Sequence, residues 1–235
     1  MSNFGFGDVN DFYDNYYNLV LRTGLIGKAQ DQTHRSLERV WTELDLFEQV
    51  LEVGAGAGDH RQFVKHRYKN YYETDICFEK NLYERQLISN SLGSASNVIR
   101  EYADFASLQY EDATFNRLIA TCVLLHLENP ELALREARRV TKSQGVISIL
   151  VPCEPGILLR MSRNLLTARK ASRLGFQGYN LFNARDHVSH FSRINELIKF
   201  VFRKDKMQVS RYPFRIQSWN LNLYYVYTIY RGEDE

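Results

Sequence analysis

A glycine-rich segment that follows a predicted strand constrains the fold of this chain more than any other feature. The apolar run Val50–Val53 leads directly into Gly54, Gly56 and Gly58. Alternate glycines remove side chains from a turn, so that a ligand can lie against bare backbone. A second strand-like run ends in an acid, Asp75, about 20 residues further on. This distance predicts one helix between two parallel strands, and it places a carboxylate where the ribose hydroxyls of a bound nucleoside would lie.

The rest of the chain alternates between strand and helix patterns. Strands are predicted at residues 49–54, 70–75, 97–102, 117–124 and 146–151. The triplet Asn129-Pro130-Glu131 predicts a helix start, because a capping Asn precedes a Pro of the first turn and an acid near the positive helix end. We expect that helix to end near Gly145, and residues 8–47 to be helical. The alternation predicts a parallel sheet with helices on both faces.

The C-terminal third departs from this alternation. Met207–Arg215 and Leu221–Tyr230 predict a hairpin added to the edge of the sheet. The region between this hairpin and the fifth strand is longer than a plain connection requires. We therefore expect Pro155–Gly178 to form an inserted helical cap and Asn183–Arg203 the last crossover helix. In open α/β sheets ligands bind beyond the carboxyl ends of the strands, so the cap should cover the site.

Three segments resemble class I S-adenosylmethionine-dependent methyltransferases. Glu52–Gly58 has the E-x-G-x-G-x-G form of that family's first motif, unlike the G-x-G-x-x-G of nicotinamide enzymes. Ala103–Phe105 is similar to the segment whose acid meets the adenine amino group. Phe115–His126 resembles the fourth strand, with Asn116 in place of the usual Asp at a position away from the cofactor. The resemblance covers roughly residues 48–155 and is only topological beyond.

This resemblance implies a fold, a cofactor and a set of binding residues. The fold is a Rossmann-like doubly wound sheet of strand order 3-2-1-4-5-7-6 with an antiparallel C-terminal hairpin strand, and the cofactor is S-adenosylmethionine. Asp75 is the expected ribose-binding acid, with Glu73 in reserve. The full set of expected cofactor-binding residues is Glu52, Gly54, Ala55, Gly56, Gly58, Asp75, Ile76, Asp104, Phe105 and Cys122.

Length and composition favour one cytoplasmic domain. We divide its 235 residues into an N-terminal helical lid (1–47), a cofactor-binding core (48–153), the cap (154–186) and a last helix with the hairpin (187–235). No apolar run approaches the ~20 residues of a membrane span, and Met1–Gly5 does not resemble the start of a signal peptide. Cys77, Cys122 and Cys153 form no C-x-x-C pair, which predicts reduced thiols and no metal site. A net charge of +2 gives no indication of a nucleic-acid partner.

Methyl transfer requires few specific catalytic residues, so the sequence gives little direct indication of the active site. Methyl transfer from a sulfonium is an in-line displacement, in which the protein mainly aligns the reactants and excludes water. Catalytic candidates are therefore histidines near the predicted site. His126 follows the fourth strand and is a candidate base or substrate contact, or else a structural residue. His187 and His190 follow the cap and either line the pocket, cap a helix or lie on the surface.

The charge of the cap gives the best indication of the acceptor. Between Glu154 and Asp186 the chain has no acid but carries Arg160, Arg163, Arg169, Lys170, Arg173 and Arg185. Arginine binds phosphate and carboxylate in forked geometry, so we expect an anionic acceptor held by Arg160 and Arg163. A solvated basic face and a surface that touches anionic membranes are the alternatives, the second because leucines interleave with the arginines. Tyr13 and Tyr17 are candidates for a substrate-binding lid over the sulfonium, or for core packing.

Together these features predict O-methylation of a small anionic acceptor. Nothing resembles the Asn/Asp-Pro-Pro-Tyr motif of amide methylation. The segments Arg211–Phe214 and Trp219–Leu223 are loosely similar to bacterial methyltransferases of surface-glycan loci, which suggests polysaccharide biosynthesis and a phosphorylated or nucleotide-linked sugar. The alternatives are a lipid-headgroup methyltransferase at the membrane surface and a non-catalytic S-adenosylmethionine-binding partner. The sequence leaves open the acceptor, the methylated atom and whether the chain forms a homodimer.

Overall fold

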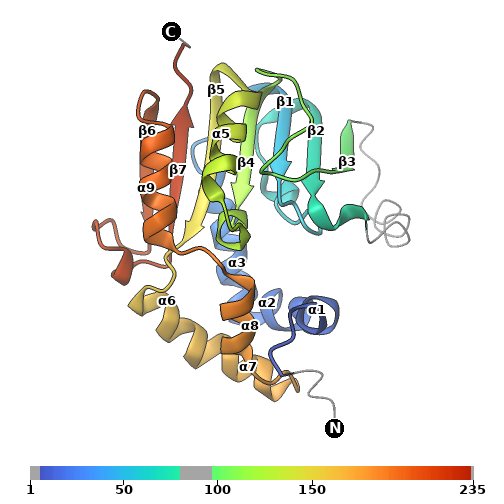
Figure 1. The fold of residues 1–235 in the computed structure, drawn as a ribbon, viewed down its shortest axis with the longest axis vertical. Coiled ribbons are helices and arrows are strands. Elements are labelled where there is room, and N and C mark those ends of the chain that lie inside the picture. The colour runs from blue at the N-terminus through green and yellow to red at the C-terminus, as the bar shows by residue number, and fades with distance from the viewer. Residues whose placement is uncertain (1–5, 80–96, 234–235) are drawn as a thin grey trace.

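A seven-stranded sheet organises the computed structural model, which describes residues 6–79 and 97–233 (Figure 1). The strand order is 3-2-1-4-5-7-6, as predicted. The strands are β1 (Leu46–Val53), β2 (Arg67–Asp75), β3 (Val98–Tyr102), β4 (Phe115–Thr121), β5 (Thr141–Pro152), β6 (Lys206–Tyr212) and β7 (Tyr224–Tyr230). The first five pair in parallel, and β7 runs antiparallel to both β5 and β6. The predicted fold class is confirmed.

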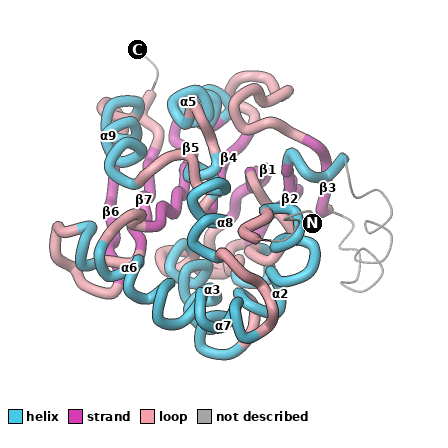
Figure 2. The backbone as a smooth tube through the Cα atoms, turned by 60° about the horizontal axis from the view of Figure 1, so that its bottom comes forward, coloured by secondary structure: helices cyan, strands magenta, loops and turns pink. Residues whose placement is uncertain are grey.

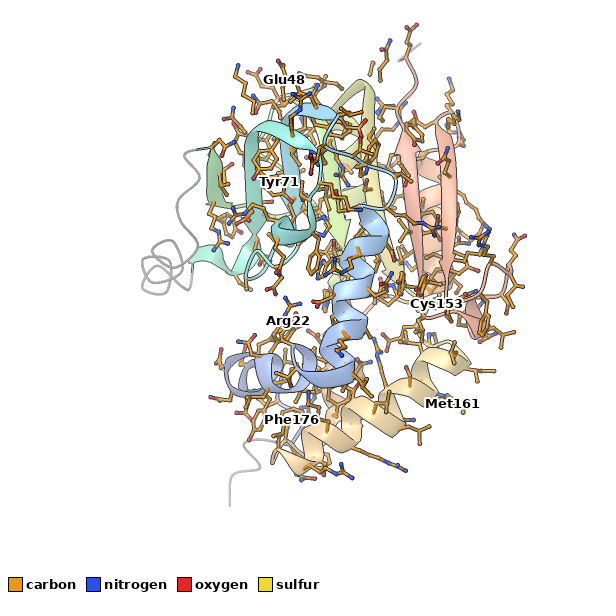
Figure 3. The ribbon with its side chains drawn as sticks, turned by 180° about the vertical axis from the view of Figure 1, so that it is seen from behind. Arg22, Glu48, Tyr71, Cys153, Met161 and Phe176 are labelled. Atoms are coloured by element: carbon orange, nitrogen blue, oxygen red, sulfur yellow. The ribbon has the colours of Figure 1, made fainter. Side chains whose placement is uncertain are left out.

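Helices cover both faces of the sheet. Figure 1 shows α5 (Pro130–Val140) and α9 (Phe191–Val201) on the face toward the viewer. Seen from behind in Figure 3, α3 (Gly24–Leu37) crosses the opposite face. Strand β7 lies between these layers, and six of its seven side chains are buried. A strand covered on both faces is apolar along its whole length rather than on alternate residues.

Several boundaries differ from the prediction. The N-terminal region predicted to be helical over residues 8–47 ends its last helix at Leu37, and β1 already begins at Leu46. Strands β2 and β5 are also longer than expected. No helix joins β1 to β2; the chain forms only a 3-10 turn at Arg61–Phe63. Strand β1 ends at Val53 and β2 already begins at Arg67, and the residues between them form the glycine loop, the 3-10 turn and a short extended segment in place of a helix. Helix α5 ends at Val140 and β5 begins at the next residue, so Gly145 lies inside a strand, near an irregularity in its pairing with β4.

The remaining helices lie together beyond the carboxyl ends of the parallel strands (Figures 1 and 2). The N-terminal group is α1 (Val9–Asp11), a π-helical turn (Phe12–Tyr16) and α2 (Tyr17–Leu21). The predicted cap comprises α6 (Ile157–Ser162), a π-helical turn (Arg163–Thr167), α7 (Ala168–Arg173) and α8 (Tyr179–Asp186). Phe12 is buried between Phe176 and Phe182, so the two groups share a small core of their own.

No helix in residues 6–79 or 97–233 combines the length and the apolar character needed to cross a bilayer. The predicted absence of a signal peptide concerns Met1–Gly5, which lie outside the described residues.

Candidate functional site

The glycine loop after β1 presents open backbone at the carboxyl edge of the sheet. A Cβ atom on Gly54 would lie 2.6 Å from Cγ2 of Val123, so this glycine lets the loop pack against the segment after β4. A Cβ atom on Gly56 would meet no atom within 4 Å, and the backbone there has a φ of +53°. The Gly56 amide donates a hydrogen bond of 2.9 Å to Oδ2 of Asp75. Open backbone beside a carboxylate at this edge fits a nucleoside cofactor such as S-adenosylmethionine.

Two acids near the end of β2 have different environments. Asp75 is half-buried, and its Oδ1 accepts a hydrogen bond of 2.8 Å from the amide of Cys77. Each of its oxygens accepts one backbone hydrogen bond and keeps a lone pair for a ligand. Glu73 is fully buried and accepts hydrogen bonds from Nε of both Arg61 and Arg100. Because Arg100 also donates to the carbonyl of Ala57, Glu73 supports the glycine loop from below. The geometry therefore favours Asp75 as the ribose contact.

Two of the predicted cofactor contacts have side chains that point into the protein. Glu52 is 2% exposed, and its Oε2 accepts a hydrogen bond of 2.7 Å from the hydroxyl of Tyr71. Burial raises the pKa of Glu52 to about 7. Phe105 is buried in the main core. Glu52 and Phe105 can thus reach a cofactor only through their backbones, because their side chains fill the interior.

The other predicted cofactor contacts lie at the strand edge. The amide of Ala55 donates to the carbonyl of Thr74, which ties the loop to β2. Ile76 is 59% exposed beside Asp75 and offers apolar surface. Asp104 is half-buried, and its Oδ1 accepts from the amide of Ala106. Cys122 directly follows β4 with a φ of +62°, and burial raises the pKa of its thiol to about 12.

A buried ionic network behind the loop was not predicted from the sequence. Arg117 of β4 is fully buried and donates two hydrogen bonds, of 3.0 and 2.6 Å, to the carboxylate of Glu38. His60, next to the glycine loop, lies 3.1 Å from the same carboxylate. Burial alone would raise the pKa of Glu38, but Arg117 and His60 outweigh it and lower this pKa to about 2. The network joins the end of α3 to the sheet and to the loop. Its one signal in the sequence is an arginine within an apolar strand.

Beyond the carboxyl end of β4, Asp186 connects the N-terminal helices to the segment that follows this strand. Its Oδ2 accepts a hydrogen bond of 2.9 Å from the hydroxyl of Tyr13. Nδ1 of His126 lies 3.2 Å from the Asp186 carbonyl oxygen and 3.4 Å from its Oδ1. Because Nδ1 faces two acceptors, it is the donor nitrogen of His126, and Nε2 is the nitrogen that can accept a hydrogen bond.

Glu154, at the end of β5, forms a second group of contacts. His187 donates from Nδ1 to Oε2 of Glu154 over 2.5 Å, and Arg163 pairs with Oε1 over 2.5 Å. Burial would raise the pKa of Glu154, but His187 and Arg163 lower it to about 2. The pKa of Asp186 is also lowered, because His126 and Tyr13 outweigh the effect of burial. Burial lowers the pKa of His187. Near neutral pH this site therefore holds two carboxylates, one guanidinium and a neutral His187.

His126, Asp186 and His187 also offer ligand atoms within 4.8 Å of one another. Each of these side chains already has a hydrogen-bonding partner or an acidic neighbour in the protein. Those contacts account for the cluster without a metal ion.

The tyrosines of the proposed lid lie across the site. Tyr13 and Tyr17 stack with ring centroids 5.5 Å apart and an angle of 25° between the planes. Burial raises the pKa of Tyr17 to about 12, and the charge of Asp59 acts in the same direction. Arg22, which forms an ion pair of 2.6 Å with Asp59, lies where the N-terminal helices meet the sheet in Figure 3. The tyrosine pair thus extends from the glycine-loop side of the site to Asp186.

Two predicted site residues lie apart from this group. His190 is exposed and caps α9, because its Nδ1 accepts from the amide of Arg193 over 3.3 Å. Arg160 is exposed. Two other cap cations bind backbone: Lys170 donates to the carbonyls of Val20 and Thr23, and Arg185 donates to that of Gly7. Among the described cap residues, Arg163 is the cation whose ion pair lies at the strand edge.

Comparisons with known proteins agree with this geometry. Residues 51–149 match the family model of the methyltransferase domain. The sarcosine/dimethylglycine N-methyltransferase of Halorhodospira halochloris is 26% identical over 164 residues, which span 62% of this chain and 58% of that enzyme. The surface-glycan resemblance gains no support from these relatives.

Two solved structures show the same fold. One is a complex between the Haloferax volcanii Trm112 methyltransferase activator and a methyltransferase, where the match has a TM-score of 0.60 at 10% identity and covers 97% of this chain and 99% of that one. The other is phosphoethanolamine N-methyltransferase 2 of Haemonchus contortus in complex with S-adenosyl-L-methionine. That match has a TM-score of 0.61 at 12% identity and covers 96% of this chain and 60% of that one.

Proposed function

Because the chain belongs to the class I S-adenosylmethionine-dependent methyltransferases, we propose that it methylates the amine nitrogen of a small acceptor that also carries an anionic group. The observation that carries this proposal is the pair of ionised carboxylates, Glu154 and Asp186, beyond the strand edge. S-adenosylmethionine, when bound, supplies a methyl group already activated by a sulfonium. The glycine loop and Asp75 are the residues proposed to hold it.

The charge balance of the site supports an amine. Two carboxylates face a single guanidinium, and the pKa shifts of both acids keep them ionised near neutral pH. Aromatic faces attract cations, and the stacked Tyr13 and Tyr17 lie beside Asp186. An ammonium group entering this site would meet the favourable charge of these two acids.

The position of Arg163 is the reason to expect an anionic group on the acceptor. Its guanidinium pairs with Glu154 through one nitrogen, which leaves further donors for a carboxylate or a phosphate. Two of the relatives named above are N-methyltransferases of sarcosine/dimethylglycine and of phosphoethanolamine. Each of these acceptors combines a nitrogen with an acid, and we extend that combination to this chain as a proposal.

His126 is the proposed base. An amine reacts only after it loses its proton, and Nε2 of His126, the ring nitrogen that does not face Asp186, can accept that proton. The imidazolium formed would be stabilised by the Asp186 carboxylate, 3.4 Å from Nδ1. The carboxylate of Glu154 lies between His187 and Arg163, and these two contacts hold it in position.

O-methylation of a sugar phosphate, the function expected from the cap's composition, becomes the second candidate. Arg163 is the observation that favours it. The expectation relied on a cluster of cap cations, and the structure directs Lys170 and Arg185 to backbone carbonyls instead.

A transfer assay with labelled methyl donor separates the two candidates. The panel should contain amino acids and amino phosphates, plain amines of similar size, sugar phosphates and nucleotide sugars. We expect labelled N-methyl product from members that combine an amine with an acid, and slower transfer to plain amines. Transfer to sugar phosphates that lack nitrogen, with none to any amine, would contradict the amine proposal and favour the second candidate.

A further inference from the structure

The outer side of the cap presents an apolar surface that the acceptor site does not use. Four cap side chains, together with Leu25 at the start of α3, are about half exposed or more: Leu25 (75%), Ile157 (52%), Met161 (53%), Leu165 (47%) and Leu166 (50%). Ile157, Met161 and Leu165 follow one another at intervals of four residues, so they form one stripe along the cap helices. Figure 3 shows Met161 on the side of the cap turned away from the sheet. We call these five residues, together with Arg160, Arg169 and Arg173, the cap ridge.

The basic residues of the ridge have no acidic neighbours in the chain segments that form it. Arg160, Arg169 and Arg173 are exposed, and none of them forms an ion pair within the described part of the chain. The cap contains no acid between Glu154 and Asp186, and both of these acids are engaged at the strand edge. The first turns of α3 add Lys28 and no acid before Asp31. The ridge is therefore both apolar and positively charged.

A groove of about 300 Å³ lies at the α7 end of this ridge, beside the start of α3. It is lined by Thr23, Gly24, Leu25, Ile26, Leu165, Leu166, Arg169, Lys170 and Arg173. Its walls come from α7, the π-helical turn before it and the start of α3, which Lys170 ties together through the carbonyl of Thr23. Apolar walls with arginines at the rim match a lipid headgroup and the upper part of its chains.

We propose that the cap ridge rests on anionic membrane surfaces. Its apolar side chains would enter the boundary between headgroups and acyl chains, while the arginines meet lipid phosphates. A second copy of this chain is a poorer occupant, because a two-fold contact would bring the same cations against one another. Nucleic acid would satisfy the arginines but leave the exposed leucines and methionine in water. This contact does not depend on which acceptor is methylated.

Vesicle co-sedimentation tests the proposal on the full chain. The probes are phosphatidylcholine vesicles with and without about 30% phosphatidylglycerol, at low and physiological salt. We expect binding to the anionic vesicles only, and weaker binding as the salt concentration rises. Arg169→Gln with Arg173→Gln should reduce the partition coefficient roughly 30-fold, since each cation near an anionic surface contributes about fivefold. Leu165→Gln with Leu166→Gln should also reduce it.

Matched variants elsewhere on the surface are the controls. Lys65→Gln with Lys69→Gln removes two exposed cations on the opposite part of the molecule, and Leu44→Gln removes a leucine that is 87% exposed. These controls should bind vesicles like the parent, and melting curves should show that all variants fold. Equal binding to neutral and anionic vesicles, no binding at all, or equal losses in ridge and control variants would each overturn the proposal. Concentration-dependent dimerisation that the ridge variants abolish, without vesicle binding, would assign the ridge to a second copy instead.

Discussion

At the scale of single residues, two glycines of one loop serve different purposes. Gly54 is required by packing, because any Cβ there would collide with Val123. Gly56 borders open space, so a side chain there would occupy the volume proposed for the cofactor. Gly56→Ala should therefore weaken binding of S-adenosylhomocysteine while costing the fold only about 1–2 kcal/mol for the positive φ. Gly54→Val should lower both the melting temperature and cofactor binding.

Calorimetric titration and thermal unfolding of the two variants separate these effects. A Gly56→Ala protein that binds S-adenosylhomocysteine as tightly as the parent would show that the ligand does not approach this part of the loop.

Asp75 is the residue on which the position of the ribose depends. Asp75→Ala should weaken S-adenosylhomocysteine binding by roughly 1–3 kcal/mol, the range for hydrogen bonds to a charged group. Asp75→Asn should lose less, since it keeps an acceptor for the Gly56 amide. If Asp75→Ala binds S-adenosylhomocysteine as tightly as the parent, Asp75 does not contact the ribose. Glu73 would not take its place, because both of its carboxylate oxygens are paired with arginines.

Sequence reasoning went furthest at this scale where function depends on backbone. The glycines and Asp75 could be predicted as cofactor contacts because their spacing is local, and that role stays a prediction. The roles of Glu52 and Glu73 depend on which face of their strand is buried in the protein, and the sequence does not show which face this is. The pairing of Arg117 with Glu38 joins residues that are 79 positions apart, and no local pattern reports it.

At the scale of elements, the Glu38–Arg117 pair fixes α3 to the sheet. Glu38→Ala would leave Arg117 buried with an uncompensated charge, which costs about 3–5 kcal/mol. Urea unfolding measures this loss. Glu196→Ala on α9, which breaks an exposed ion pair with Lys199, is the matched control and should change stability little. Equal effects of the two substitutions would mean that the buried pair does not hold α3 in place.

Also at this scale, the cap's two arginines should differ in their effect on the acceptor. Arg163→Ala should raise the KM for a soluble acceptor about tenfold or more and leave S-adenosylhomocysteine affinity nearly unchanged. Arg160→Ala should change neither quantity, because this side chain is exposed. Steady-state kinetics with the acceptor found by the transfer assay measures both. Equal KM values in the parent and Arg163→Ala would place the acceptor away from Glu154.

The predicted helix and strand boundaries were wrong where a strand is longer than its sequence pattern indicates. A helix was predicted between β1 and β2, but β2 begins at Arg67 rather than near residue 70, and the shortened connection forms only a 3-10 turn. Strand ends are set by pairing with neighbours from distant parts of the chain, so a local pattern does not locate them.

At the scale of the whole molecule, topology brings the site together. Parallel strands place the glycine loop, Asp75, Cys122 and Glu154 along one edge, and the N-terminal and cap helices close over it (Figure 2). The strand order followed from resemblance to a family, and the structure confirms it. Tyr13 and Asp186 are 173 positions apart in the sequence, so their hydrogen bond could not be predicted without the fold.

Isothermal titration calorimetry with S-adenosylhomocysteine and with NAD tests most directly whether this edge of the sheet binds S-adenosylmethionine. The alternate glycines and the half-buried Asp75 predict one site per chain for S-adenosylhomocysteine and no heat of binding for NAD. Binding of NAD without binding of S-adenosylhomocysteine would contradict the account.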